Sequence, residues 1–321
     1  MNNIKFKKSL MAAAAGAVLA TVGMSAANAN SLLFPYWTTN NGAQSALSLS
    51  TDGSVGGARA IHYVYNYGPS CTHYDAYGSM TGNDLLQQSV ASPAAGGYGL
   101  AVSSDKSTPV YFPLANQTGF LVVTDTTSTS TTAISGDMAI VDPSTGLVAS
   151  YAATSNALAT DSANDAANEG NFTAVTNTSY GLSFYPQSLV QTSWYSIVMG
   201  NMNNAIANGR GWTATAKVSN AGAVYNNDEA PFSGTSDKTI TCAGSVAPTD
   251  LMTTAQAAAV GPNGGLIQAI WAPVTANGTN KTTDGRTIVD TATGVLMYKM
   301  QLVNASVGGV FGGKQFMFQQ Q

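Results

Sequence analysis

The chain has 321 residues, of which only 9% are charged, and 12 basic against 16 acidic side chains give a formal net charge of −4. Soluble domains usually carry about 25% charged residues. Because the basic residues are scattered singly and acids outnumber them, the composition excludes a nucleic-acid-binding surface of the usual basic kind. A surface with so little charge also repels copies of itself only weakly.

The first 29 residues have the pattern of a secretory signal peptide. Lys5, Lys7 and Lys8 form its positive start, Leu10 to Val22 its apolar stretch, and Ser25-Ala-Ala-Asn-Ala29 its cleavage pattern. We therefore expect a mature protein that begins at Asn30, leaves the cytoplasm through the Sec pathway, and is secreted, periplasmic or held at the cell surface. Without the three lysines, 9 basic residues face 16 acids, a net charge of −7.

The N-terminal part reads as a series of short strands. Alternating or apolar runs predict strands at Ser31–Trp37, Gln44–Thr51, Arg59–Tyr67 and Gly119–Asp125. Between them, Thr81 and Asp84 resemble a capping box, and the spacing of the apolar residues that follow predicts a helix over Asn83–Ala91. The whole pattern predicts a mainly β, antiparallel, sandwich-like fold in one or two lobes with two or three short helices.

A polar stretch divides the chain. Residues 155–179 contain almost no large apolar side chains, so we expect a linker or long loop between a β lobe at 30–154 and a second β lobe at 180–321. Gln191–Ala207 fits a helix or a strand. Further on, Thr253 and Gln256 stand in capping-box register, which predicts a helix over Thr249–Val260, and the remaining segments return to strands.

Cys71 and Cys242 are the two cysteines of the chain. An even number of cysteines in an exported protein indicates a disulfide. The bond would close a loop of about 170 residues, contribute at most about 5 kcal/mol on the chain-entropy estimate, and tie the two halves together. The alternative is a metal site of Cys71, His62, His73 and Cys242, although this spacing matches no common zinc motif.

Tyrosines and ionisable residues are densest between Arg59 and Asp84. A row of aromatic rings could stack sugars, so a ligand-binding face would comprise Tyr63, Tyr65, Tyr67, Tyr74 and Asp75, provided that the rings are exposed. Packing across a sheet is the structural alternative. His73 and Asp75 could also pair as base and orienting acid, because residues i and i+2 of a strand face the same way. No Gly-x-Ser-x-Gly motif or other recognisable nucleophile accompanies them, so we expect no catalytic residue.

Calcium is the cofactor for which the sequence offers oxygen ligands. Asn226, Asp228 and Glu229 form the tightest group of side-chain oxygens, and Asp161, Asp165 and Glu169 recur at helical spacing. Neither group fits the EF-hand pattern, and a turn between strands explains the first equally well. Beyond the signal, no run approaches 18 apolar residues, so no transmembrane helix is expected.

The signal followed at once by Ser31-Leu-Leu-Phe-Pro-Tyr-Trp37 and a low-charge chain of short strands resembles uncharacterised secreted, surface-layer-like proteins of Gram-negative bacteria. The resemblance implies an extracellular or cell-surface β protein without catalysis, whose partners are its own copies or envelope components. A glycan- or ligand-binding adhesin module using the tyrosine row is the second hypothesis, and an exported hydrolase the third.

Overall fold

The computed structural model describes residues 28–29, 31–53, 56–97, 101–103, 107–127, 133–142, 147–155, 170, 172, 179–202, 211–274, 280–281, 287–288, 290–303 and 319–320. The predicted signal up to residue 27, most of the predicted linker and the acids at 161–169 lie outside these residues. Within them the protein is mainly β, with antiparallel sheets, as predicted.

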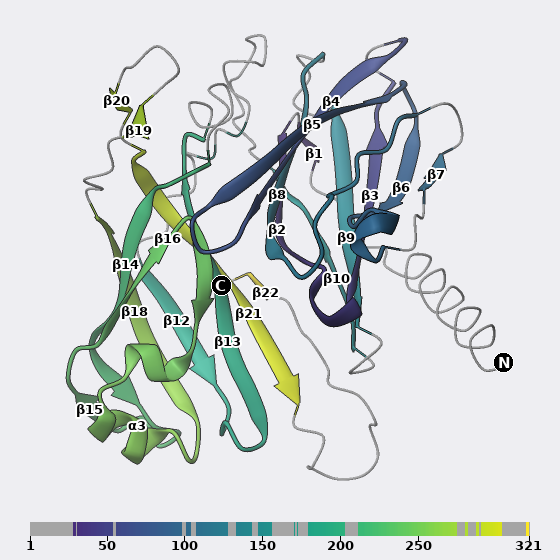
Figure 1. The fold of residues 1–321 in the computed structure, drawn as a ribbon. Helices are drawn as coiled ribbons and strands as arrows, with labels where there is room; N and C mark the ends of the chain where they lie inside the picture. Colours follow the sequence, from purple (N-terminus) through teal and green to yellow (C-terminus); the bar gives the residue numbers. More distant parts are fainter. Residues whose placement is uncertain are drawn as a thin grey trace, which may run out of the picture.

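Two sheets come from the N-terminal part of the chain (Figure 1). Sheet I runs in the order β1 (Asn28–Ala29), β9 (Ile134–Asp142), β3 (Gln44–Thr51), β6 (Leu85–Ser89) and β7 (Ala101–Ser103), with β10 (Leu147–Ala152) also paired to β9. Sheet II runs in the order β11 (Thr154–Ser155), β2 (Ser31–Thr38), β8 (Thr118–Asp125), β4 (Arg59–Tyr67) and β5 (Thr72–Met80).

Two further sheets come from the C-terminal part. Sheet III runs in the order β17 (Ala243–Val246), β13 (Val190–Gly200), β21 (Ala292–Val303) and β22 (Gln319–Gln320). Sheet IV runs in the order β12 (Ser179–Phe184), β18 (Gly265–Val274), β14 (Thr215–Tyr225) and β15 (Pro231–Ser233), with β16 (Asp237–Thr241) also paired to β14. A small ribbon joins β19 (Asn280–Lys281) and β20 (Thr287–Ile288).

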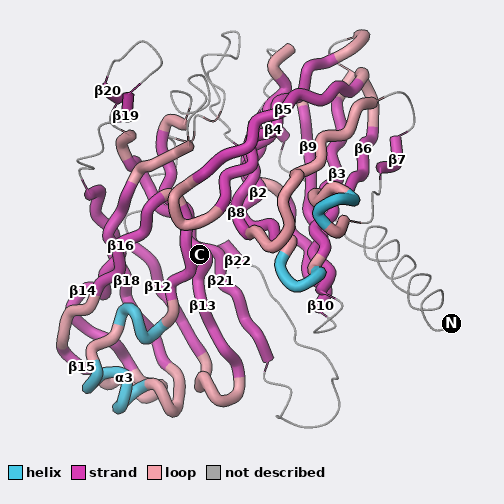
Figure 2. The backbone as a smooth tube through the Cα atoms, in the orientation of Figure 1, coloured by secondary structure: helices cyan, strands magenta, loops and turns pink. Residues whose placement is uncertain are grey.

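Helical structure in the described chain is limited to α3 and short 3-10 turns (Figure 2). The helix α3 (Thr254–Val260) begins with the predicted capping box, in which Thr253 and Gln256 bond reciprocally, so the capping box is confirmed. The helix is shorter than predicted, because residues 249–251 belong to a 3-10 turn. The 3-10 turns are η1 (Asn40–Gly42), η2 (Pro93–Ala95) and η4 (Pro248–Leu251). Of the ambiguous segment 191–207, residues 191–200 lie in the long strand β13, and residues 203–207 lie outside the described residues.

The helix predicted over Asn83–Ala91 is wrong. This segment forms β6, in which Leu86 and Gln88 point into the protein while Leu85 is exposed, a period of two and not of 3.6. The Thr81–Asp84 pattern does form a local bond, because the Thr81 amide donates to the Asp84 carboxylate at 3.2 Å. That bond shapes a turn ahead of a strand, and not the start of a helix.

The central strands of sheet II, β2, β8 and β4, are buried on both faces. Leu32, Tyr63 and Leu121 pack into the core shared with sheet I. Their neighbours Leu33, Val64 and Val122 pack into the core of the C-terminal part. Alternate residues of the same strands thus enter two cores, which places sheet II between sheet I and the C-terminal sheets.

On the C-terminal side, residues of sheet III contact the N-terminal part. Tyr195 of β13 and Tyr298 of β21 are cross-strand partners. The Tyr195 ring packs edge-to-face on Tyr36 at 5.0 Å between centroids, and the Tyr298 hydroxyl shares a hydrogen bond of 2.7 Å with Thr154. The N-terminal and C-terminal parts are therefore joined by aromatic packing and by side-chain hydrogen bonds.

Candidate functional site

The β4–β5 hairpin carries the densest group of ionisable side chains in the described chain. Its antiparallel register pairs His62 with Tyr77, Val64 with Asp75 and Asn66 with His73. Because cross-strand partners point to the same side of a sheet, His62, His73, Asp75 and Tyr77 share one face. This is the face on which Val64 packs into the C-terminal core, so the cluster adjoins the boundary between the two parts.

Asp75 lies between the two histidines. The Nε2 atom of His73 is 3.2 Å from one carboxylate oxygen, and the Nε2 atom of His62 is 3.4 Å from the other. The His62 side chain is 4% exposed, that of His73 17% and that of Asp75 30%. The predicted pairing of His73 with Asp75 is thus present in the structure, and His62, which the sequence did not assign to this pair, completes the cluster.

The electrostatics of the cluster favour an ionised carboxylate. Burial alone would raise the pKa of Asp75, but hydrogen bonding and the charge of His62 and His73 outweigh it and lower the pKa to about 2. The His62 ring stacks on the Tyr77 ring with centroids 4.2 Å apart and planes 5° apart. The His62 imidazole is therefore held by a carboxylate at Nε2 and by an aromatic ring on one face.

This arrangement is better suited to holding the hairpin than to chemistry. Both imidazoles direct Nε2 at the Asp75 carboxylate, so this nitrogen of each ring is already engaged in a contact within the cluster. Within the described part of the chain, no group of three or more His, Cys, Asp or Glu side chains is placed to hold a metal ion. The predicted alternative of a metal bound by Cys71, His62, His73 and Cys242 is accordingly not formed.

The tyrosine row faces the opposite way and is mostly covered. Tyr63 and Tyr65 are fully buried, and the Tyr65 hydroxyl donates to the Val110 carbonyl at 3.1 Å. Tyr67 and Tyr74 are partly buried against the same core. The expectation of an exposed sugar-stacking face is thus wrong for Tyr63 and Tyr65, because sheet I covers the side of β4 on which they lie.

The acidic group at 226–229 forms a turn between β14 and β15. The side-chain oxygen of Asn226 accepts the backbone amides of Asp228 at 3.0 Å and Ala230 at 2.9 Å. Glu229 adopts a left-handed backbone with φ of 61°. Since the Asn226 oxygen is occupied by amides, the predicted calcium ligand set of Asn226, Asp228 and Glu229 gives way to the turn that was its alternative.

Cys71 and Cys242 are both buried, and both are free thiols in the structure. No S–S bond joins them there, but they form a close pair, as the predicted disulfide requires. The two residues meet, because the sulfur of Cys71 lies 3.6 Å from the carbonyl of Thr241, the residue before Cys242. Burial raises the pKa of the Cys71 thiol to about 12.

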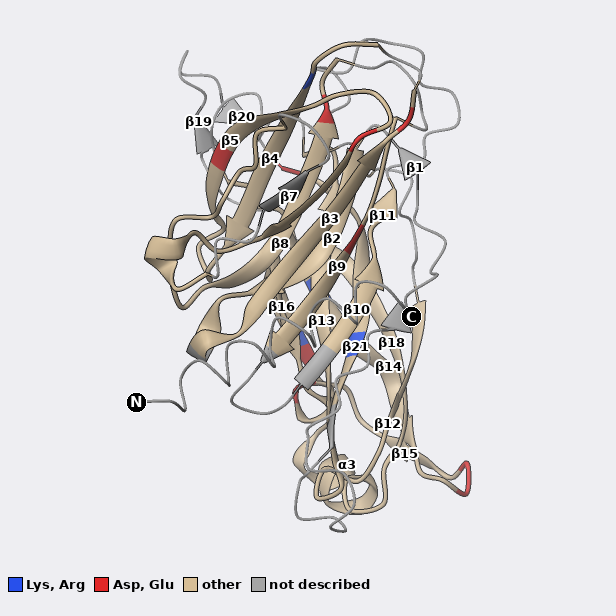
Figure 3. Ribbon diagram, turned by 90° about the vertical axis from the view of Figure 1, so that its right-hand side faces the viewer, with Lys and Arg blue, Asp and Glu red and all other residues tan. Residues whose placement is uncertain are grey.

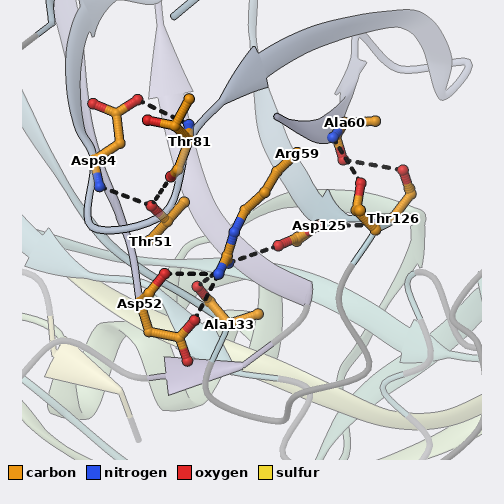
Figure 4. A network of polar contacts seen from close by, with 10 residues as sticks. Thr51, Asp52, Arg59, Ala60, Thr81, Asp84, Asp125, Thr126 and Ala133 are labelled. Carbon is orange, nitrogen blue, oxygen red and sulfur yellow. Dashed lines mark hydrogen bonds and ion pairs between the residues drawn. The ribbon is translucent and has the colours of Figure 1, made fainter. Parts of the chain in front are cut away.

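Figure 4 shows a buried ion-pair network at one end of the N-terminal part, which was not predicted from the sequence. The guanidinium of Arg59, at the start of β4, contacts Asp125 at 2.9 Å and Asp52 at 2.8 Å. It also donates to the carbonyls of Ala133 and Asp52. Arg59 and Asp125 are fully buried, so this network clamps the end of β8, the start of β9 and the loop after β3. The sequence signal that could have indicated this network is the position of Arg59 and Asp125, which each lie at one end of an apolar run.

In comparisons with known proteins, no family model and no curated protein matches the chain.

Proposed function

We propose that this chain is an exported structural protein that assembles with copies of itself outside the cytoplasm and has no catalytic role. Three features support this proposal: the expected signal peptide, the low charge of the chain, and open sheet edges in a sandwich-like stack of antiparallel sheets. Figure 3 shows how few charged residues lie along the described chain. In the described chain no helix has the length and apolarity required to cross a membrane.

The observation that carries the proposal is the character of two edge strands. Within the described residues, β5 pairs with β4 and is bridged on its outer side at Ser79–Thr108, and β12 pairs with β18. Edge strands are usually protected by lysine, proline or short length. The sequence of β5, THYDAYGSM, and that of β12, SYGLSF, contain neither lysine nor proline and span nine and six residues. The one carboxylate in them, Asp75 of β5, is paired with His62 and His73.

Most of the other edges are short or protected, whereas β10, with the six-residue sequence LVASYA, is a further edge without lysine or proline. β15 has three residues and begins with Pro231, and β16 carries Asp237 and Lys238. β11 has two residues and β17 four. Addition of a strand from a second copy to β5 or β12 would extend the main-chain ladder, and the weak net repulsion between low-charge surfaces would not oppose it.

The adhesin hypothesis loses its main support because Tyr63 and Tyr65 are buried. Of that hairpin, Tyr77 remains well exposed, with 62% of its surface accessible. One ring stacked on His62 is a small platform for a glycan, so we place self-assembly first.

Electron microscopy and sedimentation of the mature protein, with calcium and with chelator, test the proposal. We expect ordered filaments, tubes or sheets in wild type. Gly181→Lys places a charge on the exposed side of β12, where the nearest atom to an added Cβ is 3.8 Å away. Thr72→Lys does the same on β5. Both variants should disperse the assemblies or reduce them several-fold.

The matched control is Ala259→Lys, which adds the same charge at an exposed position of α3, away from both edges. It should assemble like wild type. Monomers of wild type under all conditions would overturn the proposal, and glycan binding lost on Tyr77→Ala would then favour an adhesin. Assembly that is unaffected by either edge variant would show that the contacts lie elsewhere.

A further inference from the structure

The turn of the β4–β5 hairpin reaches the C-terminal part at the junction of β16 and β17 (Figure 1). Cys71 occupies that turn, and Cys242 is the single residue between β16 and β17. The Cys71 sulfur lies 3.6 Å from the carbonyl oxygen of Thr241 and also accepts a hydrogen bond from the backbone amide of Ala243. The two peptide groups that flank Cys242 therefore bracket the sulfur of Cys71.

The backbone holds both cysteines in place. Cys71 has φ of 53° and Cys242 has φ of 64°, a left-handed conformation that is uncommon for residues with a side chain. The amide and carbonyl of Cys242 are bonded to Ala214 at 2.9 Å and to Val198 at 2.8 Å. On the other side, a Cβ on Gly211 would come within 1.7 Å of the Cys71 carbonyl oxygen, so the chain passes this turn as closely as glycine permits.

We propose that Cys71 and Cys242 are a modification site, at which a disulfide forms between the two parts of the molecule during folding, before these parts dock. The oxidant is a disulfide of the exported environment, either a small molecule or a thiol oxidase. One cysteine thiolate attacks a sulfur of the oxidant, whose S–S bond breaks and releases one thiolate. The second cysteine then attacks the mixed disulfide, forms the Cys71–Cys242 bond and releases the second thiolate.

The atoms and electrons balance in this exchange. The two cysteines lose two protons and two electrons in total, and the oxidant is reduced from one disulfide to two thiols. The order follows from access: Cys71 is 2% exposed and Cys242 3% exposed in the docked state. The attacking species is a thiolate, which burial disfavours, so the docked dithiol is a poor substrate for any oxidant. The folded thiol form is thus long-lived once it has closed.

Refolding tests both the bond and the order. The exported chain is unfolded with reductant and refolded in a mixture of oxidised and reduced glutathione, while a second sample is refolded in reductant alone and then given the same mixture. Alkylation with mass spectrometry counts the free thiols. We expect the first sample to contain the Cys71–Cys242 bond and to unfold about 5 to 10 °C higher than the reduced form. The second sample should keep both thiols for at least tenfold longer than the unfolded chain does.

The matched control is the double variant Cys71→Ala/Cys242→Ala, which should unfold at the same temperature under both conditions. It also separates loss of the bond from loss of side-chain packing. Two free thiols after refolding with oxidised glutathione would overturn the bond. Oxidation of the folded dithiol as fast as that of the unfolded chain would overturn the order. Since neither readout depends on assembly, failure here leaves the proposed function intact.

Discussion

Arg59 illustrates how a single buried charge organises several chain segments. Its guanidinium meets two carboxylates and two carbonyls, and these partners belong to the loop after β3, to β8 and to the residue before β9. A pair such as Arg59–Asp125 gains little over apolar residues of the same shape, because both charges lose their water. Its importance is that either partner, once left alone, is a buried and uncompensated charge.

Arg59→Met should therefore lower the free energy of unfolding by about 3 to 5 kcal/mol, because Asp125 remains buried without its partner. Denaturant titration measures the change. The control is Lys217→Met, which removes the exposed pair between Lys217 and Asp237 and should cost less than about 1 kcal/mol. A loss of under 1 kcal/mol for Arg59→Met would mean that the network does not bear on stability.

Asp75 provides a pH-dependent contribution. Its pKa in the folded protein, about 2, lies below the ordinary value of 3.8, so the folded state binds the proton less readily than the unfolded state. The stabilisation is fully present above about pH 4 and is lost as the pH falls towards 2. Because the side chain is 30% exposed, we expect about 1 to 2 kcal/mol rather than the full value of the shift.

Asp75→Asn should remove this part of the acid sensitivity. Unfolding free energies measured from pH 5 to pH 2 should fall less steeply in the variant than in wild type. Asp237→Asn, which removes an exposed carboxylate of the surface pair with Lys217, serves as the control. Parallel curves for wild type and Asp75→Asn would show that the histidines do not stabilise the charged carboxylate.

At the scale of elements, the sequence predicted those strands whose pattern depends on burial alone. Gln44–Thr51 and Arg59–Tyr67 are confirmed with these bounds, because apolar residues mark their inward faces. β5 was missed, since an edge strand buries little of its surface and its sequence, THYDAYGSM, has few apolar residues. His62 joins His73 and Asp75 through the register of the β4–β5 hairpin, which local sequence does not specify.

The N-terminal cap of α3 shows how far a local sequence signal accounts for the role of a residue. Gln256 is almost fully buried, and its amide donates to the carbonyls of Phe232 at 2.7 Å and Gly234 at 3.1 Å while its oxygen accepts the Thr253 amide. Gln256→Ala should lower the free energy of unfolding by about 2 to 4 kcal/mol, because it leaves two carbonyls without their donor and creates a cavity. Thr253→Ala, which removes only the cap, should cost about 1 kcal/mol.

Thr254→Ala is the control, because it removes a neighbouring exposed threonine and keeps the cap. Its unfolding midpoint in denaturant should match wild type or exceed it slightly, since alanine favours the helix. Equal losses for Thr253→Ala and Gln256→Ala would mean that Gln256 acts through the cap and not through β15.

For the whole molecule, the decisive feature is a sheet that belongs to two cores. The apolar run Phe120-Leu-Val-Val123 of β8 sends Phe120 and Val122 into the C-terminal core and Leu121 and Val123 into the core with sheet I. A strand buried on both faces reads as a continuous apolar run. The sequence contains that signal, but not which surface covers the second face, because that surface comes from residues 180 onwards.

If the two cores depend on sheet II, the molecule unfolds as one unit. Phe120→Ala, at the boundary, and Leu121→Ala, on the opposite face, should each lower the same single calorimetric transition, with losses of about 3 to 5 kcal/mol. Leu114→Ala, at a position that is 44% exposed, should have little effect. The ratio of van't Hoff to calorimetric enthalpy should stay near one in all three variants. Two transitions, of which Leu121→Ala shifts only one, would instead establish independent lobes, with sheet II folding on sheet I alone.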